Sequence, residues 1–227
     1  MGVVSVHLAD VGFPASLRLL RKPKPGSIPG LVHADVGLGA TFGYTPARPS
    51  PGRVGLLGFW RDDAALDQFE ASHPLAAQLG GGLVVHARPL RIHGEWPGVD
   101  ADVPKQRAVE HEGPVLVLTL ARTKFTRSVP FFRASGPAEK AVRSAPGNLF
   151  SSALLRPPFI SSVSLWESSE AAMDYAYSGH QHGHPEALAA GRAKPFHHQQ
   201  AFVRLAITEV RGSLGGRNAL PAAAVAV

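Results

Sequence analysis

The chain has 227 residues, of which 44% are hydrophobic and 18% charged, a composition typical of a folded protein with one large or two small domains. It contains no cysteine, which excludes disulfides, iron–sulfur clusters, thiolate metal sites and cysteine nucleophiles. The net charge of +6 comes from 23 basic and 17 acidic side chains that are scattered along the chain, so we expect no nucleic-acid partner.

We expect no segment that directs the chain to a membrane. Its start, MGVVSVHLADVG, lacks the basic residues and the long apolar stretch with which a signal peptide begins. No apolar run approaches the roughly 20 residues that a membrane-spanning helix needs. The sequence therefore predicts a cytoplasmic protein without a membrane span.

In chain order, the first half alternates apolar runs typical of strands with stretches of helical spacing. The pattern predicts the order β-α-β-β-α-β, with strands at Val3–Ala9, from near Leu31, at Val54–Phe59 and at Gly82–Ile92, and helices at Pro14–Arg21 and after a capping Asp62. Residues 94–113 are polar, contain proline and show no periodicity, which indicates a linker.

The second half repeats that order. It predicts strands at Val115–Ala121, from near Leu149, at Ile160–Leu165 and at Gln200–Val210, and helices at Arg127–Ser144 and after a capping Ser168. The last stretch is rich in Gly, Ala and Val without periodicity, so we expect a flexible tail.

A shared motif shows that the two halves are copies of one unit. The aligned positions are Trp60 with Trp166, Phe69 with Tyr175 or a near neighbour, and His73-Pro74 with His184-Pro185, the second copy carrying about five extra residues before its His-Pro. A large ring at the end of a core strand is usually a packing residue, and this is how we interpret both tryptophans.

The order β-α-β-β-α-β is that of a ferredoxin-like unit, whose sheet leaves one apolar face uncovered. Two such units bury both faces by packing together, so the predicted fold is α+β, with two ferredoxin-like repeats forming an intramolecular dimeric α/β-barrel. We expect residues 1–93 to form the first repeat, 94–113 the linker, 114–211 the second repeat and 212–227 the tail. An apolar cavity is expected between the two sheets.

The second repeat holds four short motifs: a strand ending in Leu-x-Arg, a helix with Phe-Phe-Arg-Ala-Ser-Gly, a Ser-Leu-Trp, and a His-x-x-Ala-hydrophobic sequence. They fall on Leu120–Arg122, Phe131–Gly136, Ser164–Trp166 and His184–Leu188. Together they resemble the spheroidene monooxygenase family over about residues 115–205, and more weakly over the first half through the repeat.

The resemblance implies a dimeric α/β-barrel and a haem-dependent monooxygenase with heme b as cofactor. The implied partners are dioxygen, an electron donor and an apolar small-molecule substrate, which is a carotenoid in the namesake enzyme; a homo-oligomer stays open. The implied site residues are His184 as axial iron ligand with His182 as second choice, Arg133 and Ser135 as catalytic hydrogen-bond donors, and Arg122, Lys124 and Arg127 as partners of the haem propionates.

Residues 180–198 read HQHGHPEALAAGRAKPFHH and hold five of the eleven histidines. Three interpretations stay open. In the first, His184 alone binds haem iron, and Pro185 begins a helix whose small alanines let a flat macrocycle approach. In the second, His180, His182 and His184 bind zinc or copper from an extended segment. In the third, the histidines belong to a polar loop, and the His-Pro at His73 shows that the motif also occurs without a cluster.

Other chemistry finds no support in the sequence. It lacks a Gly-x-Ser-x-Gly elbow and a phosphate loop ending in Gly-Lys-Ser/Thr, which excludes the common serine hydrolase and nucleoside triphosphate sites. The alternative to an oxygenase is a non-catalytic module that binds an apolar ligand or haem, because one fold can serve both functions.

Overall fold

A computed structural model describes residues 2–21, 23–24, 26–41, 48–100, 102–106, 109–177 and 196–218. The strands are β1 (Val3–Asp10), β2 (Leu31–Thr41), β3 (Arg48–Trp60), β4 (Leu83–Gly94), β5 (Val115–Thr123), β6 (Asn148–Arg156), β7 (Phe159–Trp166), β8 (His197–Arg211), β9 (Ser213–Leu214) and β10 (Arg217–Asn218). The helices are α1 (Ala15–Leu19), α2 (Asp63–Ser72), α3 (Pro74–Leu79), α4 (Ser128–Arg143), α5 (Ser169–Tyr177) and the 3₁₀ helix η1 (Phe125–Arg127). None of the helices in the described part of the chain has the length and apolar character that crossing a bilayer requires.

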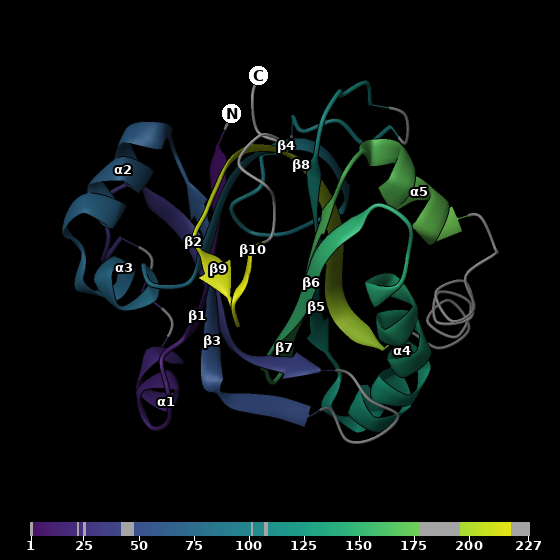
Figure 1. The fold of residues 1–227 in the computed structure, drawn as a ribbon, viewed down its shortest axis with the longest axis horizontal. Helices are drawn as coiled ribbons and strands as arrows, with labels where there is room; N and C mark the ends of the chain where they lie inside the picture. The colour runs from purple at the N-terminus through teal and green to yellow at the C-terminus, as the bar shows by residue number, and fades with distance from the viewer. Residues whose placement is uncertain are drawn as a thin grey trace.

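The strands β1 to β8 close into one antiparallel barrel in the order β1-β3-β2-β6-β7-β5-β8-β4. Each half contributes four neighbouring strands in the same ferredoxin-like order, β4-β1-β3-β2 and β8-β5-β7-β6, and the halves join at the seams β4–β8 and β2–β6. Helices α1 to α3 lie outside the first half, and α4 and α5 lie on the opposite side, outside the second (Figure 1). The predicted α+β fold of two ferredoxin-like repeats is confirmed.

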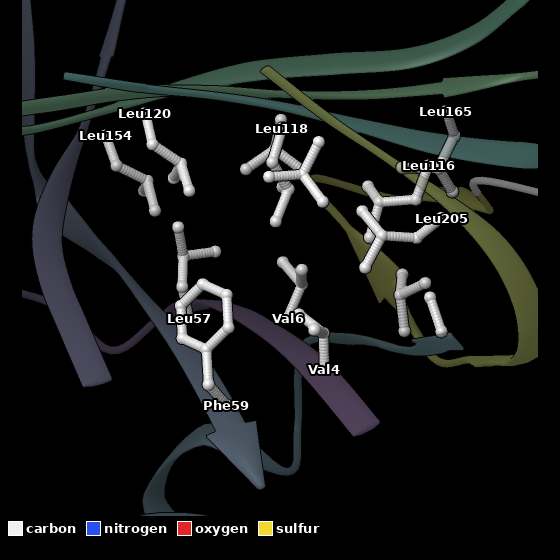
Figure 2. Close-up of a cluster of buried hydrophobic side chains, with 14 of the residues drawn as sticks. Val4, Val6, Leu57, Phe59, Leu116, Leu118, Leu120, Leu154, Leu165 and Leu205 are labelled. Atoms are coloured by element: carbon white, nitrogen blue, oxygen red, sulfur yellow. The ribbon is translucent and has the colours of Figure 1, made fainter. Parts of the chain in front are cut away.

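The inside of the barrel is a packed apolar core. On β5, alternate residues Leu116, Leu118 and Leu120 point inward and are fully buried, because successive strand residues face opposite sides of a sheet. Figure 2 shows them meeting Val4 and Val6 of the first half across the barrel. The predicted cavity between the sheets is therefore wrong for the described core, since an eight-stranded barrel is just wide enough for side chains to fill it.

Part of the predicted linker belongs to this core. Trp96 and Val103 are only 3% and 2% exposed and pack against the barrel interior. The indole N–H of Trp96 donates to Oδ2 of Asp35 on β2, at 3.0 Å. The linker is thus a structural part of the barrel as well as a connection, and the proposed domain boundaries stay a prediction.

The tail also begins with structure. Strands β9 and β10 pair as a two-stranded hairpin, and Leu214 is buried against the barrel core. Between them, Gly215 and Gly216 have φ values of 60° and 73°, which glycine adopts without steric cost and which suit a tight hairpin turn. Residues 213–218 therefore differ from the flexible tail predicted for residues 212–227.

The aromatic pairs of the two repeats have the same geometry. Trp60 packs on Phe69 of α2 with ring centroids 4.8 Å apart, and Trp166 packs on Tyr175 of α5 at 5.2 Å. Both tryptophans are almost fully buried. The predicted alignment of these positions, and the packing role of the tryptophans, are therefore confirmed.

Both helices that follow the tryptophans begin at the predicted caps. The Asp62 carboxylate accepts the backbone N–H of Ala65 at 2.9 Å, and the Ser168 hydroxyl accepts that of Ala171 at 3.1 Å. Each cap satisfies a backbone donor that the first turn of the helix leaves unpaired.

In the first half, a hydroxyl on β1 accepts the buried indole. The Trp60 N–H donates to the Ser5 hydroxyl oxygen at 2.8 Å. The neighbouring position on β3 is Gly58, where an added Cβ would lie 2.6 Å from the indole nitrogen. Glycine at this position therefore makes room for the indole.

The second half exchanges these two positions. Its Trp166 N–H donates to Ser164 on β7 at 2.9 Å, and Ser164 faces Val117 on β5. Ser164 is the counterpart of Gly58, and Val117 that of Ser5. One hydroxyl per half satisfies the indole, but it comes from a different strand.

A buried polar network holds α2 on the first half. The Ser5 hydroxyl, which accepts the Trp60 N–H, also forms a hydrogen bond of 3.1 Å with Nε2 of His7. Burial lowers the pKa of His7 to about 4, against the opposing charge of Glu70. His7 is therefore neutral at pH 7 within this network.

Glu70 of α2 is the centre of the network. His86 Nε2 lies 2.8 Å from its carboxylate, and Arg211 forms an ion pair with it. Burial alone would raise the pKa of Glu70, but the hydrogen bonds from His86 and Arg211 lower it overall to about 2.

Replacing Ser164 with Ala should lower the free energy of unfolding by about 1–3 kcal/mol, because it leaves the buried Trp166 N–H without an acceptor. Adding Val117→Ser to that variant re-creates the arrangement of the first half and should restore part of the loss. Urea unfolding of the three proteins measures both effects. Wild-type stability of Ser164→Ala would contradict this account of the indole bond.

Stability should fall in acid because of His7. Its folded pKa, about 4, lies below its ordinary value of 6.5, so its contribution is complete above pH 6.5 and is lost as the pH falls towards 4. The loss should reach about 3 kcal/mol. Urea unfolding across this pH range, compared with His7→Gln, isolates the effect from the other histidines. Equal pH dependence of the two proteins would contradict it.

Candidate functional site

The outer face of the second half carries a strip of side chains that its helices only partly cover. Phe202 on β8, Thr119 on β5 and Ser162 on β7 are neighbours across the sheet and point outward. All three are half-buried. We call this strip the floor.

The first half has no comparable strip among the described residues. The counterparts of Phe202, Thr119 and Ser162 there are Val84, His7 and Leu56, and these are only 3%, 1% and 2% exposed. Helices α2 and α3 pack over this face. The two halves therefore share a backbone but differ in how much of the outer face is open.

The floor lies between the parts of the sheet covered by α4 and α5, the two helices on this side of the barrel (Figure 1). One row along the sheet, Val117 packs in the cluster under α5. One row in the other direction, Ile160 packs against Phe131 and Phe132 of α4. A ligand on the floor would thus have a helix on each side.

At the α4 end of the floor, aromatic rings surround one histidine. His197 begins β8, and its ring centroid lies 5.0 Å from that of Phe131 and 6.0 Å from that of Phe196. Its Nδ1 lies 2.9 Å from the side-chain oxygen of Gln200, whereas its buried Nε2 has no hydrogen-bond partner among the residues that the structure describes. Burial lowers the pKa of His197, which favours the neutral ring. With Nδ1–H donating to Gln200, the lone pair of Nε2 is free to accept a proton donor or bind a metal.

Two of the basic residues predicted from the sequence adjoin this end. The Arg127 guanidinium lies 5.6 Å from the ring centre of Phe196, and the backbone N–H of Lys124 donates to the Phe196 carbonyl at 2.8 Å. The structure therefore brings Lys124 and Arg127 to the same end of the site as His197.

Three other site residues predicted from the sequence lie on α4 and on β5. Arg133 is exposed on α4, and Ser135, on the same helix, is half-buried. Arg122 shares the inward side of β5 with Leu120, and its guanidinium lies 4.9 Å from the ring centre of Trp96 at the end of the barrel. It is therefore separated from Lys124 and Arg127 by the sheet.

The predicted iron ligands, His184 and His182, lie within residues 178–195, outside the described residues. Their role stays a prediction. In the part of the chain that is described, no group of three or more His, Asp and Glu side chains is arranged to hold a metal ion.

Sequence reasoning missed two buried arginines, Arg91 on β4 and Arg204 on β8, which are cross-strand neighbours at the seam between the halves. The only signal for Arg204 is its alternation with the inward-facing Val203 and Leu205 on β8. No local pattern pairs it with Arg91, because strand register brings them together.

Two surface hollows open on the first half. One, of about 470 Å³, lies between β1, α3 and the β9–β10 hairpin, and the other, of about 430 Å³, is lined by His7, Glu70 and Arg211 among others. Neither is lined by a residue that the sequence predicts for the site. We assign them to the packing of α1 to α3 and take the floor as the candidate site.

The comparison with known sequences finds one clear relative. No known family profile matches the chain. The spheroidene monooxygenase of Rubrivivax gelatinosus is 30% identical over 189 residues, which cover 81% of this chain and 71% of that protein.

Among solved structures, the chain is similar to two aldoxime dehydratase structures. One, in complex with butyraldoxime, has a TM-score of 0.54 and 12% identity and covers 91% of this chain and 79% of that chain. The other has a TM-score of 0.52 and 12% identity, with 91% and 81% covered. At this identity the similarity shows a shared fold.

Proposed function

The chain belongs to the spheroidene monooxygenase family, and on that basis we propose a monooxygenase function for it. The relationship supports an oxidoreductase that transfers oxygen to a small molecule. In such a reaction one atom of dioxygen enters the substrate and the other leaves as water, with two electrons from a donor and two protons. We propose an apolar small molecule as the substrate and the outer face of the second half as the place of reaction.

The observation that carries this proposal is the floor. Thr119 and Ser162 have small side chains, Phe202 offers a flat ring, and all three are held by the strands of a closed barrel. A rigid, partly open strip of this kind holds a flat or elongated apolar molecule without rearrangement of the backbone. The packed interior of the barrel offers no such space in the described core.

The groups beside the floor fit a haem. Among the described residues, the buried Nε2 of His197 has no hydrogen-bond partner, and the Arg127 guanidinium brings positive charge to the same end. When bound, a haem supplies the activation of dioxygen, for which side chains alone have no redox chemistry. On the sequence motif, we propose His184 as the ligand of the iron, with His182 as the second choice.

The remaining chain groups would orient and protect the reactants. Helix α4 borders the floor and carries Arg133 and Ser135, which we propose as hydrogen-bond donors to oxygen. The rings of Phe131 and Phe196 would exclude water from this end. Of the three basic residues predicted as propionate partners, Lys124 and Arg127 adjoin the α4 end of the floor, whereas Arg122 stacks on Trp96 at the end of the barrel.

Replacing His184 with Ala should abolish the Soret absorption band of protein purified with or titrated with hemin, with no change in urea unfolding. His182→Ala and His197→Ala are the matched controls and should keep the band. A full haem content in His184→Ala would contradict the ligand assignment, and its loss in His197→Ala alone would move the ligand to His197. If hemin leaves the wild-type spectrum unchanged, the haem proposal fails and a non-catalytic binding module becomes the better account.

The counterpart of Ser162 in the first half is Leu56, so replacing Ser162 with Leu gives the floor the same residue type as the first half. The added side chain should fill the strip and weaken hemin binding by at least about tenfold, the usual effect of a misplaced buried group of this size. Gln68→Leu, an exposed change on α2, is the control and should bind as the wild type does. Equal hemin affinity of Ser162→Leu and wild type, measured by absorption titration, would place the ligand elsewhere.

A further inference from the structure

Two arginines lie side by side on the outer face at the seam between the halves. Arg91 on β4 and Arg204 on β8 are register partners, and each is only 8% exposed. Val203 and Leu205, which flank Arg204, point into the barrel core, so Arg204 points outward. Burying two like charges next to each other is unfavourable unless an anion compensates them.

Neither guanidinium is fully satisfied within the described residues. The buried Nε of Arg91 and the buried Nη1 of Arg204 have no hydrogen-bond partner. Burial and the charge of Arg91 lower the pKa of Arg204, while Tyr177 opposes this. By contrast, Arg53 is paired with Asp10, and Arg88 with Asp63. Unpaired N–H groups at this depth point to an acceptor that the described residues do not supply.

The first half shows what is missing. The counterpart of Arg204 there is His86, which lies 2.8 Å from Glu70 of α2 and 3.1 Å from Glu209 of β8. Two carboxylates therefore lie beside the imidazole of His86 in the first half. The network is closed by side chains of the chain itself.

In the second half both carboxylates are replaced. Glu70 follows Phe69 on α2, and the residue that follows the matching Tyr175 on α5 is Ala176. Across the seam, His86 faces Glu209, whereas Arg204 faces Arg91. The second half thus keeps a buried cation but lacks both of the acids that satisfy it in the first half.

The arginines lie one row from the floor. Arg204 and Phe202 are two residues apart on β8, so their outward side chains start about 7 Å apart. Val117, the register partner of Arg204, packs under α5, and Thr119, the partner of Phe202, belongs to the floor. A molecule on the floor can therefore present an acidic group to the pair.

We infer that Arg91 and Arg204 form a carboxylate-binding site that takes the propionates of a haem on the floor. The inference rests on the proposed haem-dependent function and fixes the orientation of the macrocycle. Both propionates leave the same edge of the ring, so they would lie at the α5 end of the floor, beside Arg91 and Arg204, and not at the α4 end beside Lys124 and Arg127. Each guanidinium donates its unpaired N–H groups to carboxylate oxygens, which take the place that the carboxylates of Glu70 and Glu209 have beside His86 in the first half.

The test compares hemin with hemin dimethyl ester, which has the same macrocycle and iron but no carboxylates. Absorption titration of the wild-type chain should show hemin binding about tenfold to a hundredfold more tightly than the ester, the range expected for charge-assisted hydrogen bonds. In the double variant Arg91→Gln, Arg204→Gln this preference should disappear, through weaker binding of hemin and unchanged binding of the ester.

A second variant covers the case in which the double variant does not fold. Ala176→Glu supplies from α5 the carboxylate that α2 supplies in the first half. It should unfold at the same or a higher urea concentration than wild type, while its affinity for hemin falls about tenfold and its affinity for the ester does not change.

The results of these titrations distinguish failure of the carboxylate site from failure of the haem proposal. Equal binding of hemin and ester by the wild type, or hemin binding that Ala176→Glu leaves unchanged, overturns the carboxylate site and leaves the haem proposal standing. Binding of neither compound overturns the haem proposal, and the propionate site with it.

Discussion

Closure of the barrel is the constraint on which the rest of the structure depends. The four-stranded sheets of the two halves pair along both of their edges, at β4–β8 and β2–β6, so no strand of the barrel is left with an unpaired edge. The same closure brings the two apolar sheet faces together and fills the interior with leucine and valine side chains. A ligand can therefore bind only on the outer faces of the barrel, in the described part of the chain. There the helices lie over strands that barrel closure holds in place.

Duplication gave the chain two such faces, and they have diverged. On the first, α2 and α3 cover a polar network in which Glu70 lies beside His7, His86 and Arg211. The second keeps small or flat side chains at Thr119, Ser162 and Phe202. The two faces thus share a backbone arrangement but differ in the side chains they present to a ligand.

Much of the fold can be predicted from the sequence, because its signals are local. The repeat around Trp60 and Trp166 predicts two ferredoxin-like units, and Asp62 and Ser168 mark the starts of two helices. How the two sheets pack together cannot be predicted in this way. The filled interior follows from barrel closure, and the burial of Trp96 follows from the space left at one barrel end, neither of which has a local signature.

The site residues, too, can be predicted from the sequence only where their signal is local. Alternation with Leu120 already places Arg122 on the inner face, so this part of the placement was within reach of sequence reasoning. The pairing of Arg91 with Arg204 was not, because it depends on the register of two strands from different repeats. The replacement of Glu70 by Ala176 at the matching position of α5 becomes visible only when the two halves are compared in three dimensions.

The most direct test of the central claim is to locate the iron in crystals of the chain grown with hemin, from its anomalous X-ray scattering. The account predicts one iron peak outside the barrel, over the floor of Thr119, Ser162 and Phe202. A peak over the first half, beside Glu70, or inside the barrel would contradict it.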